Sequence, residues 1–196
     1  MSYLIFPSAV SKDECKTLLD YCLRNLSLNK AFTIKEGFGL NDGDESLETS
    51  PERSTTVGFI NNTHEEINNR IWGFIRNANE KHFHYNLDFF QEIQFAKYNV
   101  GDYYNWHQDS MFAPENPLTR KLSLTMSLSD HEEYDGGHLQ FFNGGKPNTV
   151  NPNLENDIKS VGTVIVFDSY DWHRITPVTR GVRYSLVCWT VGPNFV

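Results

Sequence analysis

The second half of the chain is a succession of short apolar runs separated by turn residues. Runs that are rich in β-branched and aromatic residues and bounded by Gly, Asn and Asp are typical of strands. The pattern predicts six strands, at Phe89–Val100, Tyr103–His107, Lys121–Leu128, His138–Phe142, Val161–Phe167 and Arg183–Val191. Many short strands of this kind favour a jelly roll or β-barrel braced by helices, so the expected fold is mainly β (α+β).

Two amphipathic helices are expected before these strands. Residues Ser11 to Glu14 form a capping-box pattern, and apolar residues follow at helical spacing as far as Leu26. Thr63 to Glu66 repeats the pattern ahead of apolar positions that end at Ala78. Each helix has one apolar stripe and therefore needs a second layer to cover it.

A long loop is expected between the two helices. Gly37–Arg53 is rich in glycine and acidic residues and has almost no apolar periodicity. Loops of this length inside a compact domain are often lids or binding loops, and a plain solvated loop fits the sequence equally well. Because no repeat or linker divides the chain, we expect residues 1–196 to form one domain, with helical support over roughly 1–87 and a β-rich region over roughly 88–196.

Composition excludes several classes of protein. The chain has 14 Phe, 9 Tyr and 4 Trp, enough to build a core, so wholesale disorder is excluded. Its net charge of −8 disfavours a nucleic-acid partner. No apolar run approaches the roughly 20 residues that span a bilayer, and the first residues do not resemble a signal peptide. Three cysteines without a Cys-x-x-Cys motif indicate free thiols, so we expect a cytoplasmic protein with no membrane partner.

Three residues form a candidate metal site. His107 and Asp109 lie two apart at the end of an expected strand, so their side chains point to the same face. His173, just beyond Val161–Phe167, is a candidate third ligand. Two histidines and one carboxylate are the ligands typical of non-haem Fe(II), whereas a structural zinc site would have a fourth ligand, often Cys. Other histidines have weaker contexts: His138 at a strand start, and His64, His82, His84 and His131 without suitable partners.

A candidate anion site follows ten residues after His173. Arg183 begins a strand on which Ser185, Val187 and Trp189 share its face. An arginine that points into a barrel is costly unless an anion meets it, and a carboxylate could pair with it through two hydrogen bonds. The alternative is a structural salt bridge to an Asp or Glu at the barrel end.

These motifs together resemble a known family. His107-x-Asp109, His173, and Arg183-x-Ser185 resemble the iron- and 2-oxoglutarate-dependent dioxygenases, and the surrounding residues resemble their prolyl 4-hydroxylase-like (PKHD-type) branch. The segments that carry the resemblance are Phe95–Asp109, Asp135–Phe141 and His173–Leu186, with weaker support from Leu4–Cys15 and Arg53–Thr56. The resemblance runs from roughly Asp88 to Pro193 and is specific for the superfamily rather than for a substrate.

The resemblance implies a fold and a metal site. The fold would be a double-stranded β-helix, a distorted, cupin-like jelly roll with supporting helices. His107, Asp109 and His173 would hold Fe(II), and together with Arg183 they would be the catalytic residues. Asp109 stands where halogenating relatives lack the carboxylate, which favours hydroxylation.

The resemblance also implies a cosubstrate site. Arg183 would bind the distal carboxylate of 2-oxoglutarate, helped by Tyr98 and Ser185. The positions that match the rest of this pocket are Leu139, Ile175 and Trp189. Some prolyl hydroxylase relatives have a tyrosine for the same carboxylate on the strand after the first metal motif, where this chain has Thr125 and Ser127.

The implied activity is hydroxylation by O2 coupled to conversion of 2-oxoglutarate into succinate and CO2, with ascorbate as a candidate reductant. Proline in a protein or peptide is the substrate we expect. Aromatic residues that could receive it are Tyr103, Tyr104, Trp106 and Trp172, although core packing is the commoner role of such residues. Alternatives are a hydroxylase of a free amino acid or other small metabolite, and a non-enzymatic, metal-binding jelly roll. Demethylation of nucleic acid fits the charge poorly.

Overall fold

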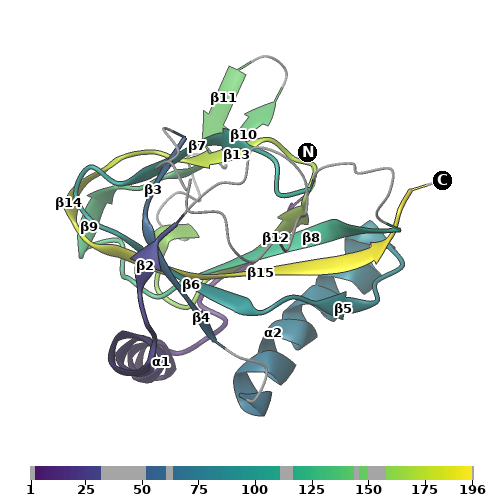
Figure 1. The fold of residues 1–196 in the computed structure, drawn as a ribbon, viewed down its shortest axis with the longest axis horizontal. Coiled ribbons are helices and arrows are strands. Elements are labelled where there is room, and N and C mark those ends of the chain that lie inside the picture. The colour runs from purple at the N-terminus through teal and green to yellow at the C-terminus, as the bar shows by residue number, and fades with distance from the viewer. Residues whose placement is uncertain are drawn as a thin grey trace, which may run out of the picture.

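The protein folds into two facing antiparallel sheets with two helices on one side (Figure 1). The computed structural model describes residues 3–31, 52–60, 64–110, 117–143, 146–149 and 158–195. The mainly β architecture expected from the sequence is therefore confirmed. Most of the predicted loop Gly37–Arg53 lies outside the described residues; only its last two positions, Glu52 and Arg53, are within them.

The larger sheet has eight strands in the order β1-β12-β8-β15-β6-β4-β2, with β5 paired to β15. In that order the strands are β1 (Tyr3–Phe6), β12 (Val164–Asp168), β8 (Leu118–Ser127), β15 (Arg183–Pro193), β6 (Ile93–Tyr98), β4 (Thr56–Ile60), β2 (Asn29–Lys30) and β5 (Phe89–Phe90).

The smaller sheet has five strands in the order β11-β10-β13-β7-β3. They are β11 (Lys146–Thr149), β10 (Leu139–Asn143), β13 (His173–Ile175), β7 (Tyr103–His107) and β3 (Arg53–Ser54). A separate pair, β9 (Tyr134–Gly136) and β14 (Val178–Gly181), lies at one end of the two sheets (Figure 1).

All six predicted strands are present, five of them with changed limits. Tyr103–His107 is β7 to the residue. The run Phe89–Val100 is divided into β5 and β6, and β12 starts at Val164 because Gly162 takes a positive φ of 77° in the preceding turn. The sequence did not predict β1, β2, β3, β4, β9, β11, β13 or β14. Most of these are short strands that pair with distant segments, whereas β11 pairs with the preceding strand, β10.

The first helix, α1 (Lys12–Asn25), has the predicted capping box. The Glu14 N–H donates to Ser11 Oγ at 3.3 Å, and the Ser11 N–H donates to the Glu14 carboxylate at 3.0 Å. The predicted apolar stripe is only partly correct, because Leu23 is 41% exposed whereas Cys15 and Cys22 are fully buried.

The second helix, α2 (Glu65–Ala78), lacks the predicted capping box. Its N-cap is His64, which makes no side-chain capping bond, and Thr63 lies outside the described residues. Because the helix starts one residue later than expected, Glu66 is too close to the N-cap to complete the box. A π-helical turn, η1 (Asn79–Phe83), continues α2 and ends at His84 with φ 57°.

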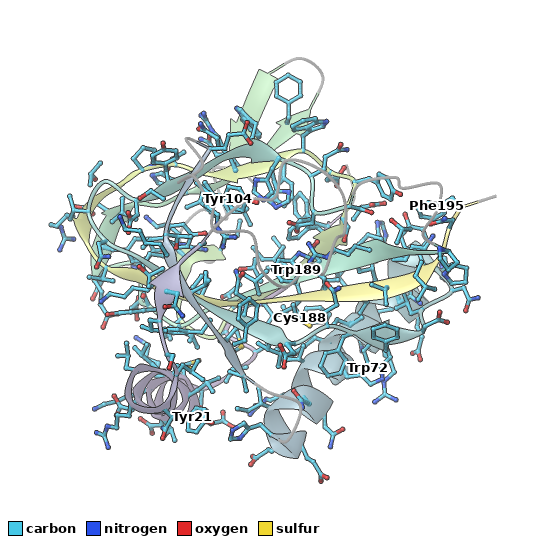
Figure 2. The ribbon with its side chains drawn as sticks, in the orientation of Figure 1. Tyr21, Trp72, Tyr104, Cys188, Trp189 and Phe195 are labelled. Carbon is cyan, nitrogen blue, oxygen red and sulfur yellow. The ribbon has the colours of Figure 1, made fainter. Side chains whose placement is uncertain are left out.

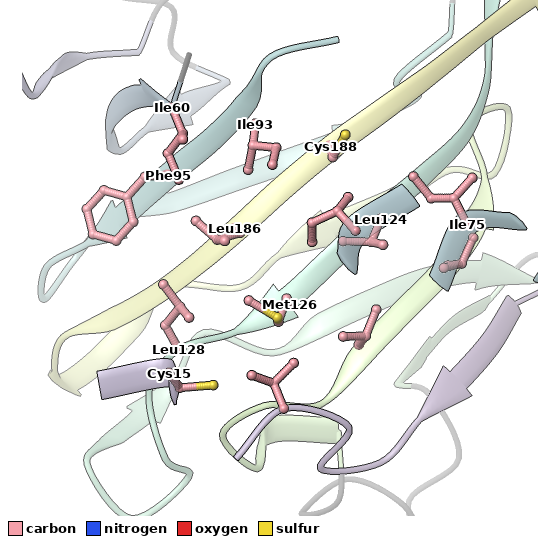
Figure 3. Close-up of a cluster of buried hydrophobic side chains, with 14 of the residues drawn as sticks. Cys15, Ile60, Ile75, Ile93, Phe95, Leu124, Met126, Leu128, Leu186 and Cys188 are labelled. Atoms are coloured by element: carbon pink, nitrogen blue, oxygen red, sulfur yellow. The ribbon is translucent and has the colours of Figure 1, made fainter. Parts of the chain in front are cut away.

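The main core lies between the helices and the eight-stranded sheet (Figure 3). Alternation along β15 sends Leu186 and Cys188 into this core, while Arg183 and Ser185 face the interior between the two sheets. The three cysteines are free, as predicted, and burial raises their pKa values to about 11 for Cys15 and about 12 for Cys22 and Cys188. In the described ranges, none of the helices has the length and apolar character to cross a bilayer.

Candidate active site

The structure brings the three predicted metal ligands together. β7 and β13 are antiparallel neighbours in the five-stranded sheet, and His107 on β7 stands opposite His173 on β13. Asp109 follows β7 by two residues. The ligand atoms of the three side chains all lie within 4.8 Å of one another. In the part of the chain that the structure describes, this is the one such group of three His, Cys, Asp or Glu side chains.

Both histidines are oriented by a backbone carbonyl two residues earlier. His107 Nδ1 lies 2.7 Å from the Asn105 carbonyl oxygen, and His173 Nδ1 lies 2.8 Å from that of Asp171. Because a carbonyl oxygen only accepts hydrogen bonds, each Nδ1 carries the proton and each Nε2 keeps its lone pair. Burial lowers the pKa of His173 to about 4, so its ring is neutral at physiological pH. The His173 ring is therefore in the form that binds metal.

The carboxylate of Asp109 is held between the two rings. Its Oδ1 lies 3.6 Å from His107 Nε2, and its Oδ2 lies 3.5 Å from His173 Nε2. Ser123 on β8 donates a 2.6 Å hydrogen bond to Oδ2. Burial alone raises the pKa of Asp109, but the two histidines and the Ser123 hydroxyl outweigh it and leave the pKa below its usual range. Two imidazole nitrogens and one carboxylate on one side of a point fit Fe(II) with its other positions open.

A cavity of about 50 Å³ leads from this triad to Arg183. Its walls come from both sheets, and Figure 2 shows Tyr104 and Trp189 in the space between them. All the metal and cosubstrate residues predicted from the sequence border this one cavity: Tyr98, His107, Asp109, Leu139, His173, Ile175, Arg183, Ser185 and Trp189. Of the four aromatic residues predicted to receive the substrate, Tyr104 borders it, whereas Tyr103, Trp106 and Trp172 do not. Thr125 also borders it, whereas Ser127 lies farther along β8.

Arg183 is buried at the end of the cavity away from the triad. Its side chain is mostly enclosed, with 7% of the residue exposed. One terminal nitrogen donates to Ser185 Oγ at 3.1 Å, and the guanidinium carbon lies 5.2 Å from the centre of the Tyr98 ring. Among the described residues no Asp or Glu pairs with Arg183. The structural salt bridge that the sequence left as an alternative is therefore not found in this part of the chain.

Sequence reasoning assigned no site role to Arg53 or Ser123, and it gave Tyr104 a role in substrate binding only. The Tyr104 ring stacks on the His107 ring with centroids 3.5 Å apart, and the guanidinium carbon of Arg53 lies 4.5 Å from the centre of the Tyr104 ring. The Nε atom of Arg53 is buried without a hydrogen-bond partner among the described residues. Ser123 could have been found, because it shares an inward face with Thr125 by strand alternation.

Comparison with known proteins shows which family the chain belongs to. The model of the 2OG-Fe(II) oxygenase superfamily matches residues 93–191, which contain the triad and Arg183. The chain belongs to this superfamily. A PKHD-type hydroxylase of Synechococcus sp. strain CC9605 is 35% identical over 98 residues, which cover 48% of this chain and 39% of that protein. The PKHD-type hydroxylase YbiX of Escherichia coli is 35% identical over 100 residues, covering 48% and 40%. The aligned region thus spans about two fifths of these relatives.

Solved structures of the superfamily share the whole fold. A prolyl-4-hydroxylase of Pseudomonas putida gives a TM-score of 0.66 at 23% identity, covering 96% of this chain and 91% of that one. A viral collagen prolyl hydroxylase of Paramecium bursaria Chlorella virus-1, in complex with 2OG, gives 0.69 at 17% identity, covering 98% and 97%. The expected double-stranded β-helix is therefore confirmed, and the PKHD-type relatives are similar to the branch that the sequence resembles.

Proposed function

We propose that this protein is a hydroxylase that uses Fe(II), O2 and 2-oxoglutarate. The observation that carries the proposal is one cavity with two histidines and one carboxylate at one end and, at the other, a buried guanidinium that pairs with no Asp or Glu among the described residues. His107, Asp109 and His173 would hold the iron. Arg183 and Ser185 would bind the distal carboxylate of 2-oxoglutarate. Residues 1–196 would act as a single catalytic domain.

The side chains of the cavity suit this chemistry. Iron bound at the triad supplies the redox chemistry that couples decarboxylation of 2-oxoglutarate to hydroxylation. The protein would bind and orient the reactants. Arg183 fixes the far end of the diacid, Leu139 and Ile175 keep water from its carbon chain, and Tyr98 packs beside the guanidinium.

The substrate that we propose first is a proline residue in a protein or peptide. The relatives support this class: the solved neighbours include prolyl hydroxylases, and one from Trichoplax adhaerens is described in complex with a hypoxia inducible factor peptide fragment (TM-score 0.64, 17% identity). The cavity wall formed by Trp189 and Tyr104 offers aromatic surface for a proline ring.

A free amino acid or another small carboxylate is the second candidate. Arg53 favours it, because a buried Nε that lacks a partner among the described residues borders the same cavity as the triad. A guanidinium donor there would bind a substrate carboxylate more strongly than a neutral peptide carbonyl. Net charge disfavours nucleic acid as a substrate.

The test is succinate formation from 2-oxoglutarate with Fe(II) and ascorbate. Proline-rich peptides and free amino acids are offered in parallel, and the product is sought by mass spectrometry as an increase of one oxygen atom. We expect His107→Ala and Arg183→Ala to abolish turnover. Matched controls are His82→Ala on η1 and Arg180→Ala, an exposed arginine paired with Asp135. Unchanged turnover in both site variants would contradict the proposed function.

A further inference from the structure

A second large cavity lies between α1 and α2, away from the proposed active site. The two helices lie apart on one side of the eight-stranded sheet (Figure 1), and the space between them measures about 410 Å³. Sites for small molecules typically have volumes of about 300–1,000 Å³. The described residues that line this cavity are all different from those that line the cavity of the triad. A ligand bound here would therefore occupy a separate site.

The floor of this cavity is apolar. Its residues come from both helices, from β8 and from the segment before α1: Val10, Leu18, Ile67, Ile71, Phe74 and Met126. Leu18, Ile67 and Phe74 are only partly buried. A ligand with an apolar body would cover these three side chains, and their removal from water would favour binding.

Two side-chain contacts connect the helices across the cavity. Glu14 on α1 forms an ion pair with Arg70 on α2. A hydrogen bond joins the Tyr21 hydroxyl to Nε2 of His64, the N-cap residue of α2. All four residues line the cavity, and the two contacts are separated by two turns of α1, or ~10 Å. Because a helix or strand of a partner protein could not lie along this gap without breaking both contacts, the gap suits a compact ligand.

The rim of the cavity is negatively charged. It carries three carboxylates and one guanidinium, from Asp13, Glu14, Glu66 and Arg70. Arg70 is paired with Glu14, whereas Asp13 and Glu66 form no ion pair in the part of the chain that the structure describes. These two carboxylates would attract a cation and repel an anion. The aromatic rings of the wall, Tyr21 and Phe74, are further groups that attract a cation.

We propose that the cavity between α1 and α2 is a binding site for a small organic cation, an amine with an apolar alkyl or aromatic body. The body would lie on the apolar floor, and the ammonium group would lie at the rim near Asp13 and Glu66. The inference goes beyond the proposed function and does not depend on it. β8 separates the two sites, because Met126 lines this cavity and its neighbour Thr125 lines the cavity of the triad.

Nuclear magnetic resonance of methionine methyl groups tests the proposal at the site itself. The chain has three methionines, and Met126 lines this cavity. Its methyl signal, assigned with Met126→Leu, is followed while 4-phenylbutylamine is added, and in a second titration while 4-phenylbutan-1-ol is added, which has the same body without the charge. We expect the amine to shift the signal to saturation and to bind about tenfold more tightly than the alcohol. No saturable shift with the amine, or equal affinity for the two probes, would overturn the inference.

A pair of neighbouring glutamates separates the charge of the rim from the charge of the helix. Glu65 and Glu66 both lie in the first turn of α2, but Glu66 lines the cavity and Glu65 does not. We expect Glu66→Gln to raise the Kd of the amine about threefold and to leave that of the alcohol unchanged. Glu65→Gln is the matched control and should change neither. An unchanged Kd of the amine in Glu66→Gln, or an equal loss in Glu65→Gln, would contradict the proposed site.

A variant that fills the cavity tests where the probes bind. Thr17 is exposed on α1 and lines the cavity, so Thr17→Trp would place a large ring in it without removing a core side chain. We expect this variant to lose binding of both the amine and the alcohol. Circular dichroism checks that it is folded. Binding of the amine to folded Thr17→Trp with the affinity of the wild type would show that the amine binds elsewhere and would overturn the inference.

Discussion

At the scale of single residues, the site depends on which ring nitrogen of each histidine is left to bind a metal. The carbonyl groups of Asn105 and Asp171 each bind the Nδ1 atom of the histidine two residues later, which turns both Nε2 atoms toward Asp109. The identity of the ligands could be predicted from spacing and motif resemblance. The orientation of their rings could not, because it depends on backbone geometry around each histidine that strand alternation does not specify.

Ser123 gives a prediction at this scale. Its hydroxyl donates to Asp109 Oδ2 and lies 2.9 Å from Ser169 Oγ. Loss of such a partner to a metal ligand typically lowers metal affinity by about 10- to 100-fold, and we expect Ser123→Ala to do so. Competition with a coloured chelator for Co(II) measures the change. Ser129→Ala, which removes another buried hydroxyl far from the ligands, is the control, and equal affinities in the two variants would contradict the role of Ser123.

At the scale of helices and strands, length decides what the sequence can predict. β7, β8 and β15 have five to eleven residues with clear apolar patterns, and the sequence located all three. β13 has three residues and carries His173, yet no alternation can be detected in so short a strand. Pairing with β10 on one side and β7 on the other defines it. A ligand position was thus predictable where its secondary structure was not.

The link between α1 and α2 gives a prediction at this scale. Glu14 pairs with Arg70, and the hydrogen bonds from Arg70 and Ser11 lower the pKa of Glu14 from 4.5 to about 2. The carboxylate therefore stabilises the fold above about pH 4.5, and this contribution is lost as the pH falls toward 2. Gln can still complete the capping box, so Glu14→Gln tests mainly the charge.

Urea denaturation across the pH range measures this effect. We expect Glu14→Gln to have a lower midpoint than wild type at pH 7, and the difference should shrink as the pH drops below about 4.5. Asp20→Asn, an exposed change on α1 that breaks no ion pair among the described residues, is the control. A difference between Glu14→Gln and wild type that does not depend on pH would show that the ion pair is not its source.

At the scale of the whole molecule, the first part of the chain completes both sheets. β1 pairs with β12, β4 pairs with β6, and β3 pairs with β7. The sequence predicted only helices in this part, because β2 and β3 have two residues each and β1 has four. The general class of fold could be predicted from the strands after Asp88, but the strands that close the sheets depend on tertiary pairing.

The contact between Val10 and Gly162 gives a prediction at this scale. The Val10 N–H donates to the Gly162 carbonyl at 3.1 Å, and a Cβ atom on Gly162 would lie 1.8 Å from the Val10 oxygen. Because Gly162 has a positive φ and no space for a side chain, Gly162→Ala should lower the free energy of unfolding by ~2 kcal/mol or more. Gly73→Ala, on α2 with open space around it, should raise it by ~0.5–1 kcal/mol. Chemical denaturation of both variants checks this, and equal effects would refute it.

The metal ligands His107 and His173 belong to the five-stranded sheet, whereas Arg183 belongs to the eight-stranded one. The two sheets would therefore bind opposite ends of the proposed cosubstrate. Side chains from both sheets, among them Ile175 and Val187, line the space between these ends. The spacing of the two sheets would therefore select for the length of the diacid. A molecule one methylene shorter or longer could reach the metal site or Arg183 but not both.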